Sequence, residues 1–262
     1  MTSIFTHPIW SEHDRYVTPQ ADFAHHGFDP TRFDMGTACL VTFSSSLFNR
    51  VLARVTVIKE EGFQWPYQST PLKICATPNG TRFGLHFPSY GGTRIANSLE
   101  QLAACGYRYV FGLGLGGALQ EDVHIGDMVV LEGAVRGDGV SRYYAPVEYP
   151  AIADAECAWS LAQVLREKGE RFHVGISFGI DALYRETEEL IASLRELGVL
   201  TIDLESSAFL TVGRRLGLRC CWAGVVSDRL VGATHEGNIH AEHVSDALLR
   251  LAGYIIGMIE RL

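Results

Sequence analysis

Short apolar runs alternate with amphipathic segments along most of the chain. Uninterrupted apolar runs of about four to eight residues are typical of strands buried on both faces of a sheet. Such runs occupy residues 38–43, 107–111, 128–135, 174–178 and 220–226. Apolar residues spaced three or four apart predict helices, and this spacing occurs at residues 48–54, 93–104, 154–169, 186–197 and from about 241 onward. The alternation predicts a mostly parallel sheet with helices on both of its faces.

Acidic side chains follow two of the predicted strands. Asp203 and Glu205 end the strand that begins at Thr201, and Asp228 comes directly after the apolar run 220–226. In α/β sheets, ligands bind at the carboxyl ends of strands. We therefore expect a site with two polar tasks, in which one carboxylate grips hydroxyl groups and another gives or takes a proton.

The composition is that of an ordinary globular protein. The 262 residues are 47% hydrophobic and 20% charged, enough to bury the core of one large α/β domain or of two small ones. The net charge of -8 argues against nucleic-acid binding, and no apolar run approaches the roughly 18 residues of a membrane-spanning helix. The first residues lack the basic and apolar regions of a signal peptide. We expect no nucleic-acid or membrane partner.

Cysteine and histidine positions bear on location and on metals. The six cysteines lie mostly in apolar patterns and form no CxxC pair, which favours buried free thiols in a reducing compartment and hence the cytoplasm. The histidines at 235, 240 and 243 do not have HExxH spacing, and no ligand set is evident around them. We expect neither a metal nor an organic cofactor.

A glycine-rich segment follows the predicted strand 107–111. Residues 112–117, Gly-Leu-Gly-Leu-Gly-Gly, match the letters of the GxGxxG dinucleotide fingerprint. That fingerprint needs a helix N-terminus to hold the pyrophosphate, whereas residues 118–126 have the pattern of a loop leading to another strand. The segment is therefore predicted to be a turn that lines a pocket with backbone, not a dinucleotide site.

Four segments resemble the nucleoside phosphorylase family of the uridine and purine nucleoside phosphorylase type. Residues 203–207, Asp-Leu-Glu-Ser-Ser, are similar to the family's acid-Met-Glu-Ser/Ala-Ala motif, and residues 227–228 to its Ser-Asp motif. Residues 114–118 resemble its glycine turn, and residues 134–154 resemble a uridine phosphorylase segment with a role at a subunit contact. The resemblance covers nearly the whole chain.

This resemblance implies a fold and an assembly. The chain, residues 1–262, should form a single three-layer α/β domain with a mixed, partly closed sheet flanked by helices, preceded by an arm at residues 1–36. In the family, a histidine before the first strand reaches a neighbouring subunit's pocket and binds the sugar 5′-hydroxyl, and His25 matches it. The resemblance therefore implies a homo-oligomer, either a dimer or a trimer of dimers.

The resemblance also assigns roles at the nucleoside. Glu205 should hold the ribose hydroxyls with Leu204 under the sugar, and Asp228 should protonate the leaving base. The insertion that reads uracil in pyrimidine-specific members has no room between Tyr184 and Glu205, so the base site is purine-like. The family's base-packing aromatic residue is replaced by Leu183, and stacking on the base should fall to Tyr184 or Phe178. Backbone of Gly116 and Gly117 should also contact the substrate.

The family's phosphate-binding residues are largely missing. Its Gly-Asp-Pro-x-Arg loop is absent, Gly112 stands at an arginine position, and Leu115 stands at a threonine position. The remaining candidates for an anion or water pocket are Ser44, Ser45, Arg50 and Gly114. Each lost contact costs on the order of 1.5–3 kcal/mol of phosphate binding.

Three functions therefore stay open at the level of sequence. The chain could be a nucleoside phosphorylase with a rearranged anion site, with a nucleoside and phosphate as its partners. It could instead be a hydrolytic nucleosidase of the same fold, with water in place of phosphate. The third alternative is a non-catalytic nucleoside-binding protein, for which the acid Asp228 would have no use.

Overall fold

The structure is a computed structural model that describes residues 15–231, 235–237 and 239–262. Its α-helices are α1 (Pro19–His25), α2 (Ser45–Leu52), α3 (Gly92–Ala104), α4 (Ala155–Glu167), α5 (Glu188–Glu196), α6 (Ser206–Arg215) and α7 (Glu242–Ile259). Short 3-10 helices are η2 (Pro30–Arg32), η3 (Val140–Tyr143) and η4 (Leu183–Arg185). The strands are β1 (Ala38–Thr42), β2 (Thr56–Val57), β3 (Leu72–Ala76), β4 (Arg82–His86), β5 (Tyr109–Ala118), β6 (Met128–Gly137), β7 (Ala151–Ile152), β8 (Phe172–Ile180), β9 (Thr201–Asp203), β10 (Arg219–Arg229) and β11 (Glu236–Gly237).

All described strands belong to one mixed sheet that closes on itself in part. The strand order is β11-β10-β6-β8-β9-β5-β1-β4-β3-β2, β7 pairs with β6, and a further pairing joins β10 to β5. The strands β5, β10, β6, β8 and β9 therefore form a ring, from which β1, β4, β3 and β2 extend as an open sheet. The pairings within the ring are both parallel and antiparallel. The expected mixed, partly closed sheet is confirmed.

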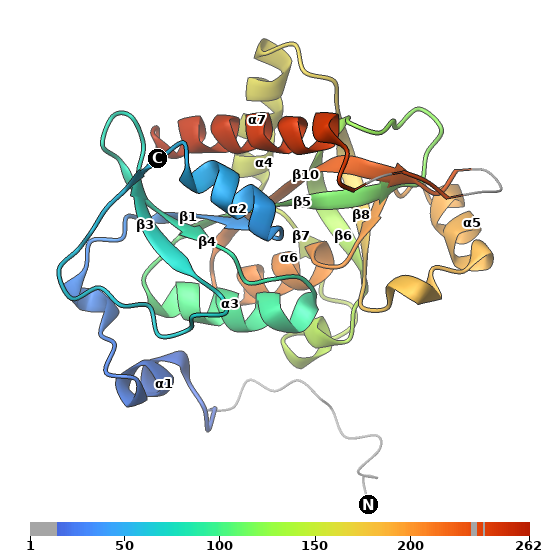
Figure 1. Cartoon of the computed structure of the whole chain (residues 1–262). Helices are drawn as coiled ribbons and strands as arrows, with labels where there is room; N and C mark the ends of the chain where they lie inside the picture. The colour runs from blue at the N-terminus through green and yellow to red at the C-terminus, as the bar shows by residue number, and fades with distance from the viewer. Residues whose placement is uncertain (1–14, 232–234, 238) are drawn as a thin grey trace, which may run out of the picture.

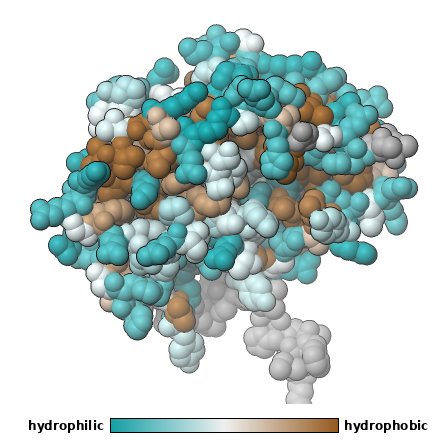
Figure 2. Space-filling model, viewed as in Figure 1, coloured by the Kyte–Doolittle hydropathy of each residue, from teal (hydrophilic) through white to brown (hydrophobic). Residues whose placement is uncertain are grey.

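Helices cover both sides of the sheet (Figure 1). Helices α2, α4 and α7 lie on one side, and α3 and α6 lie on the other. The apolar side chains of these helices join those of the strands in one large buried core, and a smaller cluster forms where α5 packs near β9. Figure 2 shows apolar side chains reaching the surface only in separate areas between hydrophilic ones on the face viewed. The predicted three-layer arrangement is thus confirmed.

The glycine-rich segment is a strand, so the predicted turn at residues 112–117 is wrong. Strand β5 runs through it and pairs with β1 and β10. Glycine is required there because the chain packs too closely for a Cβ. A Cβ on Gly112 would lie 2.9 Å from Trp222 Cδ1 and 3.1 Å from Phe209 Cζ. The place where the family carries an arginine is therefore filled by core aromatic rings, and a side chain at position 112 would enter the core.

The remaining element predictions are close to the structure. The strand and helix positions at 38–43, 93–104 and 128–135 are confirmed, and the last helix begins at Glu242. The predicted helix 186–197 corresponds to α5, which begins at Glu188, so that Glu186 lies in the link between η4 and α5. The six cysteines are free thiols, and five of them are buried. Among the described helices, none is long and apolar enough to cross a membrane.

Candidate active site

A pocket of about 260 Å³ opens where the ends of β5, β9 and β10 meet the start of α6. Its wall is partly apolar backbone and side chain and partly acidic. The lining residues are Phe43, Ser44, Leu47, Tyr90, Leu113, Gly114, Leu115, Gly116, Gly117, Leu183, Glu186, Ile202, Asp203, Leu204, Glu205, Ser227, Asp228, Ile239 and Leu248. This is the edge at which the two acid-tipped segments of the sequence were expected to meet, and they do meet there.

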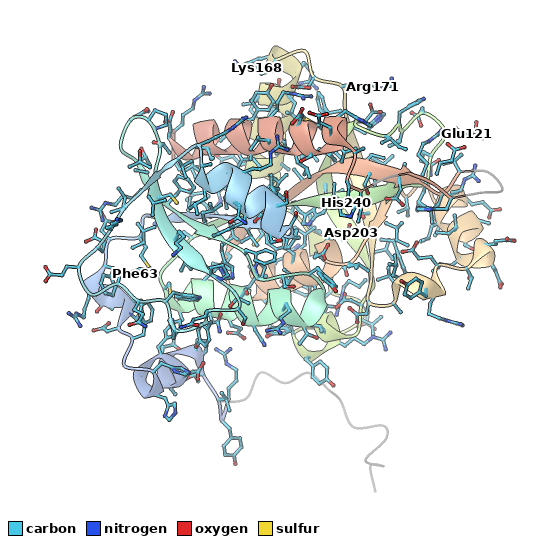
Figure 3. The ribbon with its side chains drawn as sticks, in the orientation of Figure 1. Phe63, Glu121, Lys168, Arg171, Asp203 and His240 are labelled. Atoms are coloured by element: carbon cyan, nitrogen blue, oxygen red, sulfur yellow. The ribbon has the colours of Figure 1, made fainter. Side chains whose placement is uncertain are left out.

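Asp203 organises the floor of this pocket from the end of β9. Its Oδ1 accepts hydrogen bonds from the backbone N–H groups of Glu205, at 2.8 Å, and Ser206, at 2.6 Å. Its Oδ2 accepts one from the Ser177 hydroxyl of β8, at 2.5 Å. Burial raises the pKa of Asp203, while these donors lower it. Figure 3 shows Asp203 near the middle of the molecule, whereas Glu121, Lys168 and Arg171 lie at its periphery. Asp203 is therefore a positioning residue that holds the turn carrying Glu205.

Glu205 lies at the first residue before α6 and is only 5% exposed. Its Oε1 accepts a hydrogen bond from the backbone N–H of Gly91, at 3.1 Å. Burial, and secondly the nearby charge of Asp203, raise the pKa of Glu205 to about 8. A carboxyl group in this state is desolvated and has unused acceptor positions, so it is ready for donors on a ligand.

The Gly91 donor comes from a conformationally special turn before α3. Ser89 has a φ of 76°, which is unusual for a residue with a side chain, and Gly91 has a φ of 90°. A backbone conformation with positive φ costs about 1–3 kcal/mol of conformational energy for a residue other than glycine, and it is often found at binding sites. Here the turn brings the Gly91 N–H to Glu205 and the Tyr90 side chain into the pocket wall.

Asp228 lies near the end of β10, where the strand shifts register against β5 between Val226 and Asp228. A bulge of this kind redirects a side chain. The Asp228 carboxylate accepts hydrogen bonds from the Ser227 hydroxyl, at 2.5 Å to Oδ1, and from His235 Nε2, at 2.9 Å to Oδ2. The imidazole of His235 is mostly exposed and can exchange protons with water. His235 thus connects the Asp228 carboxylate to the solvent.

Two groups near Asp228 were not predicted as site residues. Glu186 lines the pocket, and burial, and secondly the charge of Asp228, raise the pKa of Glu186 to about 7, which His235 partly opposes. His235 was considered only as a metal ligand. Neither could be found from a motif, because the link before α5 and the segment after β10 meet only in the folded chain.

Seven of the predicted site residues line the pocket and five do not. Those in the wall are Ser44, Gly114, Gly116, Gly117, Leu204, Glu205 and Asp228. Those outside it are His25, Ser45, Phe178, Tyr184 and Arg50. His25 is exposed on α1. Because the structure contains one chain, the role of His25 in the pocket of a neighbouring subunit stays a prediction.

Three of the residues outside the wall need correction. Arg50 cannot serve the anion pocket in this arrangement, because its guanidinium binds Asp246, at 2.6 Å, and the Ser245 hydroxyl on α7. Tyr184 is 96% exposed, and Phe178 packs within the smaller apolar cluster near β9. Neither ring is therefore placed to stack on a base, and the apolar wall on that side is Leu183.

The charge of the pocket is entirely acidic in the described part of the chain. Its lining includes the carboxyl groups of Glu186, Asp203, Glu205 and Asp228 but no lysine or arginine. The anion end of the pocket offers only the Ser44 hydroxyl, which caps α2 by accepting from the Leu47 N–H at 3.3 Å, and glycine backbone of β5.

The chain is similar in sequence to known proteins. Residues 75–260 match the model of a family described as the phosphorylase superfamily. A guanosine phosphorylase of Halorubrum lacusprofundi is 33% identical over 171 residues, which cover 65% of the chain and 66% of the relative. A uridine phosphorylase of Escherichia coli is 31% identical over 186 residues, covering 66% and 68%. The matches thus span about two thirds of the length of these relatives.

Solved structures extend the likeness beyond the matched sequence. A uridine phosphorylase of Vibrio fischeri has a TM-score of 0.75 at 21% identity, and the superposition covers 89% of this chain and 95% of that one. At such low identity the likeness concerns the fold alone.

The raised pKa of Glu205 makes stability depend on pH. The carboxyl binds its proton more tightly in the folded chain, at a pKa of about 8, than in the unfolded chain, at 4.5. Unfolding therefore becomes easier as pH rises between these values. Glu205→Gln removes this titrating group, so we expect the free energy of unfolding of the variant to fall less between pH 5 and pH 9 than that of the wild type. The difference between the two falls should be at least about 2 kcal/mol.

Urea denaturation at several pH values measures this effect. Glu188→Gln, at an exposed position of α5, is the matched control and should follow the wild-type curve. A Glu205→Gln curve parallel to that of the wild type would show that Glu205 is already ionised when folded.

Proposed function

The chain belongs to the phosphorylase superfamily, and on that premise we propose that it is an enzyme that cleaves the N-glycosidic bond of a ribonucleoside. The observation that carries this proposal is the presence of Glu205 and Asp228 in the wall of one pocket. The first is a desolvated carboxyl held by backbone, and the second is a carboxyl connected to an exposed imidazole. In this proposal Glu205 binds the sugar of the nucleoside, and Asp228 faces its base.

Glu205 binds the ribose in this proposal. Two vicinal hydroxyl groups can both donate to one carboxylate, which no neutral side chain matches. These donors favour the ionised form, so binding of the sugar lowers the pKa of Glu205 from its raised value. Leu204 beside it supplies apolar contact to the sugar, and the glycine backbone at positions 116 and 117 lets the nucleoside approach the sheet closely.

Asp228 supplies a proton to the leaving base. When the bond between C1′ and the base nitrogen breaks, its electron pair goes to the base, and the base takes a proton from Asp228. An oxygen of the nucleophile forms the new bond to C1′. In a purine joined to the sugar through N9, N7 is the nitrogen of the same five-membered ring that can take this proton. His235, whose Nε2 lies 2.9 Å from Asp228 Oδ2, then returns a proton from solvent.

Replacement of Asp228 tests this role. Asp228→Asn keeps the shape of the side chain but cannot protonate the base, so we expect kcat to fall by about 100-fold or more with little change in nucleoside affinity. Glu205→Gln should weaken both, because the sugar is held in the ground state and in the transition state. Steady-state kinetics combined with calorimetric binding separate the two effects. Full activity of Asp228→Asn would remove the acid role.

The nucleophile is phosphate or water, and phosphorolysis needs an anion site for the phosphate. The relatives named phosphorylases favour phosphate. Three features favour water as the nucleophile. The pocket lining is acidic, Arg50 is paired with Asp246, and aromatic rings fill the space beside Gly112. The neutral donors that remain bind a dianion only weakly. Phosphorolysis with a weak, serine- and backbone-built site is the primary proposal, and hydrolysis at the same pocket is the second.

Phosphate dependence separates these reactions. We expect phosphate affinity at least about tenfold below that of ordinary relatives, a loss of roughly 1.4 kcal/mol or more. Base release from a nucleoside panel should then rise with phosphate without saturating in the low millimolar range, and sugar 1-phosphate should form. Base release that does not change with phosphate and gives free sugar would establish hydrolysis instead. Suppose instead that sugar 1-phosphate is the main product and that the rate saturates below about 1 mM phosphate, which is the usual range of KM values. This result would refute the weak phosphate site. Nucleoside binding without base release in either buffer would indicate the non-catalytic alternative.

We also propose that the chain acts as a homo-oligomer in the cytoplasm. Apolar side chains are exposed on adjoining strands and on α4, and several belong to the segment 134–154 that resembles a subunit contact. They are Val135, Val147, Ile152, Trp159, Val174 and Ile176, of which Val147 is 74% and Trp159 65% exposed. An apolar patch of this kind is typical of a surface that another protein covers.

Gel filtration with light scattering tests this assembly. We expect at least a dimer, with a mass of twice the 28.9 kDa chain or more. Trp159→Glu should shift the population toward monomer, because it places a charge in the apolar patch, whereas Leu197→Glu at an exposed apolar position outside the patch is the control. A wild-type monomer at micromolar concentration would refute both the oligomer and the intersubunit role of His25.

A further inference from the structure

Glu186 is a second carboxyl at the acid end of the pocket, and the cleavage mechanism above does not use it. It stands in the link between η4 and α5 and lines the pocket together with Asp228. Its side chain is half-buried, whereas its neighbours Arg185 and Thr187 are exposed. The chain therefore turns this acid inward among residues that otherwise face solvent.

The carboxyl group of Glu186 has charged neighbours but no hydrogen-bond donor among the described residues. The charged groups facing it from the neighbouring elements are Asp228 on β10, which repels it, and His235 before β11, which attracts it. In the described part of the chain no hydrogen bond to its carboxyl group is found, although His235 and Ser227 both donate to Asp228. Two carboxyl groups held near each other away from water are unfavourable unless a proton or a ligand's donors lie between them.

A purine base could offer hydrogen-bonding groups to both carboxyl groups. N7 and the substituent on C6 lie on the same edge of a purine ring. If Asp228 protonates N7, a carboxyl group next to Asp228 faces the C6 substituent. An exocyclic amine there donates a hydrogen bond to a carboxylate, whereas a carbonyl oxygen there repels it.

We propose that Glu186 determines base specificity, so that the pocket selects 6-aminopurine nucleosides over 6-oxopurine nucleosides. This inference rests on the proposed function, because it takes N7 to lie at Asp228. The apolar side chains of Leu183 and Ile239 in the same wall fit the faces of a flat base but do not distinguish one purine from another. The Ser227 hydroxyl in the same wall already donates to Asp228, so Glu186 is the further carboxyl group in the lining at that end that can sense the C6 substituent.

The ionisation of Glu186 agrees with this task. With a pKa raised to about 7 by burial and by Asp228, the carboxyl is mostly ionised at pH 8 and accepts from an amine. Donation from a 6-amino group stabilises the carboxylate further. A 6-oxo group would instead require the protonated form, which is the minority at that pH.

Adenosine and inosine provide the direct comparison, because they differ at C6. At pH 8 we expect wild-type kcat/KM for adenosine to exceed that for inosine at least tenfold. Glu186→Gln should reduce this ratio at least tenfold, because an amide can donate to a carbonyl oxygen as well as accept from an amine. Glu188→Gln, an exposed acid two residues away, should leave the ratio unchanged. Circular dichroism and thermal unfolding verify that each variant is folded.

The outcomes separate this inference from the proposed function. Base release with a ratio that Glu186→Gln does not alter, or a wild-type preference for inosine, would overturn the role of Glu186 and leave the cleavage activity standing. If no nucleoside releases its base, calorimetric dissociation constants for adenosine and inosine replace kcat/KM. A tenfold preference for adenosine that disappears in Glu186→Gln would then support the inference while the catalytic function fails, and absence of binding would overturn it.

Discussion

The carboxylate of Asp203 is the interaction on which the site depends. Its two oxygens join three elements, because one accepts from the backbone at the start of α6 and the other from Ser177 on β8. A buried carboxyl is costly when unpaired, and here every bond it accepts also fixes geometry. The short strand β9 is thereby held in the ring of strands, and Glu205 is aimed into the pocket instead of toward solvent. The Gly91 N–H then completes the position of Glu205 from a turn with unusual backbone.

Close packing of β5 explains why glycine stands at position 112, where the resemblance places an arginine in the family. The glycines of this strand let Trp222 and Phe209 come within contact distance of the backbone. A long basic side chain and these rings cannot occupy the same space, so the strand is stabilised by apolar contact where a phosphate-binding arginine would lie. The other candidate cation, Arg50, is directed to Asp246 by its place in the last turn of α2. Stability of the core and affinity for phosphate therefore compete at this end of the pocket.

At the other end the pocket concentrates acids. Glu186 and Asp228 come from segments that are distant in sequence, and both face a volume of about 260 Å³. Like charges at short range raise pKa values and weaken the fold slightly. In the proposed function, a ligand that supplies protons or donors offsets that cost, so one group of residues would serve both recognition and protonation of the base. A binding surface without chemistry would have no use for this arrangement.

The sequence by itself determined the layered α/β fold, because hydrophobic periodicity depends only on which face each residue presents. It also determined the central pair, Glu205 and Asp228, since both stand at strand ends in recognisable motifs. Only the tertiary structure decided that residues 112–117 continue a strand, because cross-strand packing, and not local preference, makes those glycines necessary. It likewise decided that Arg50 binds Asp246 and that Glu186 meets Asp228, since these partners are brought together by the fold across 196 and 42 positions, as the residue numbers show. Such distances carry no periodic signal, so no reading of neighbouring residues could have revealed them.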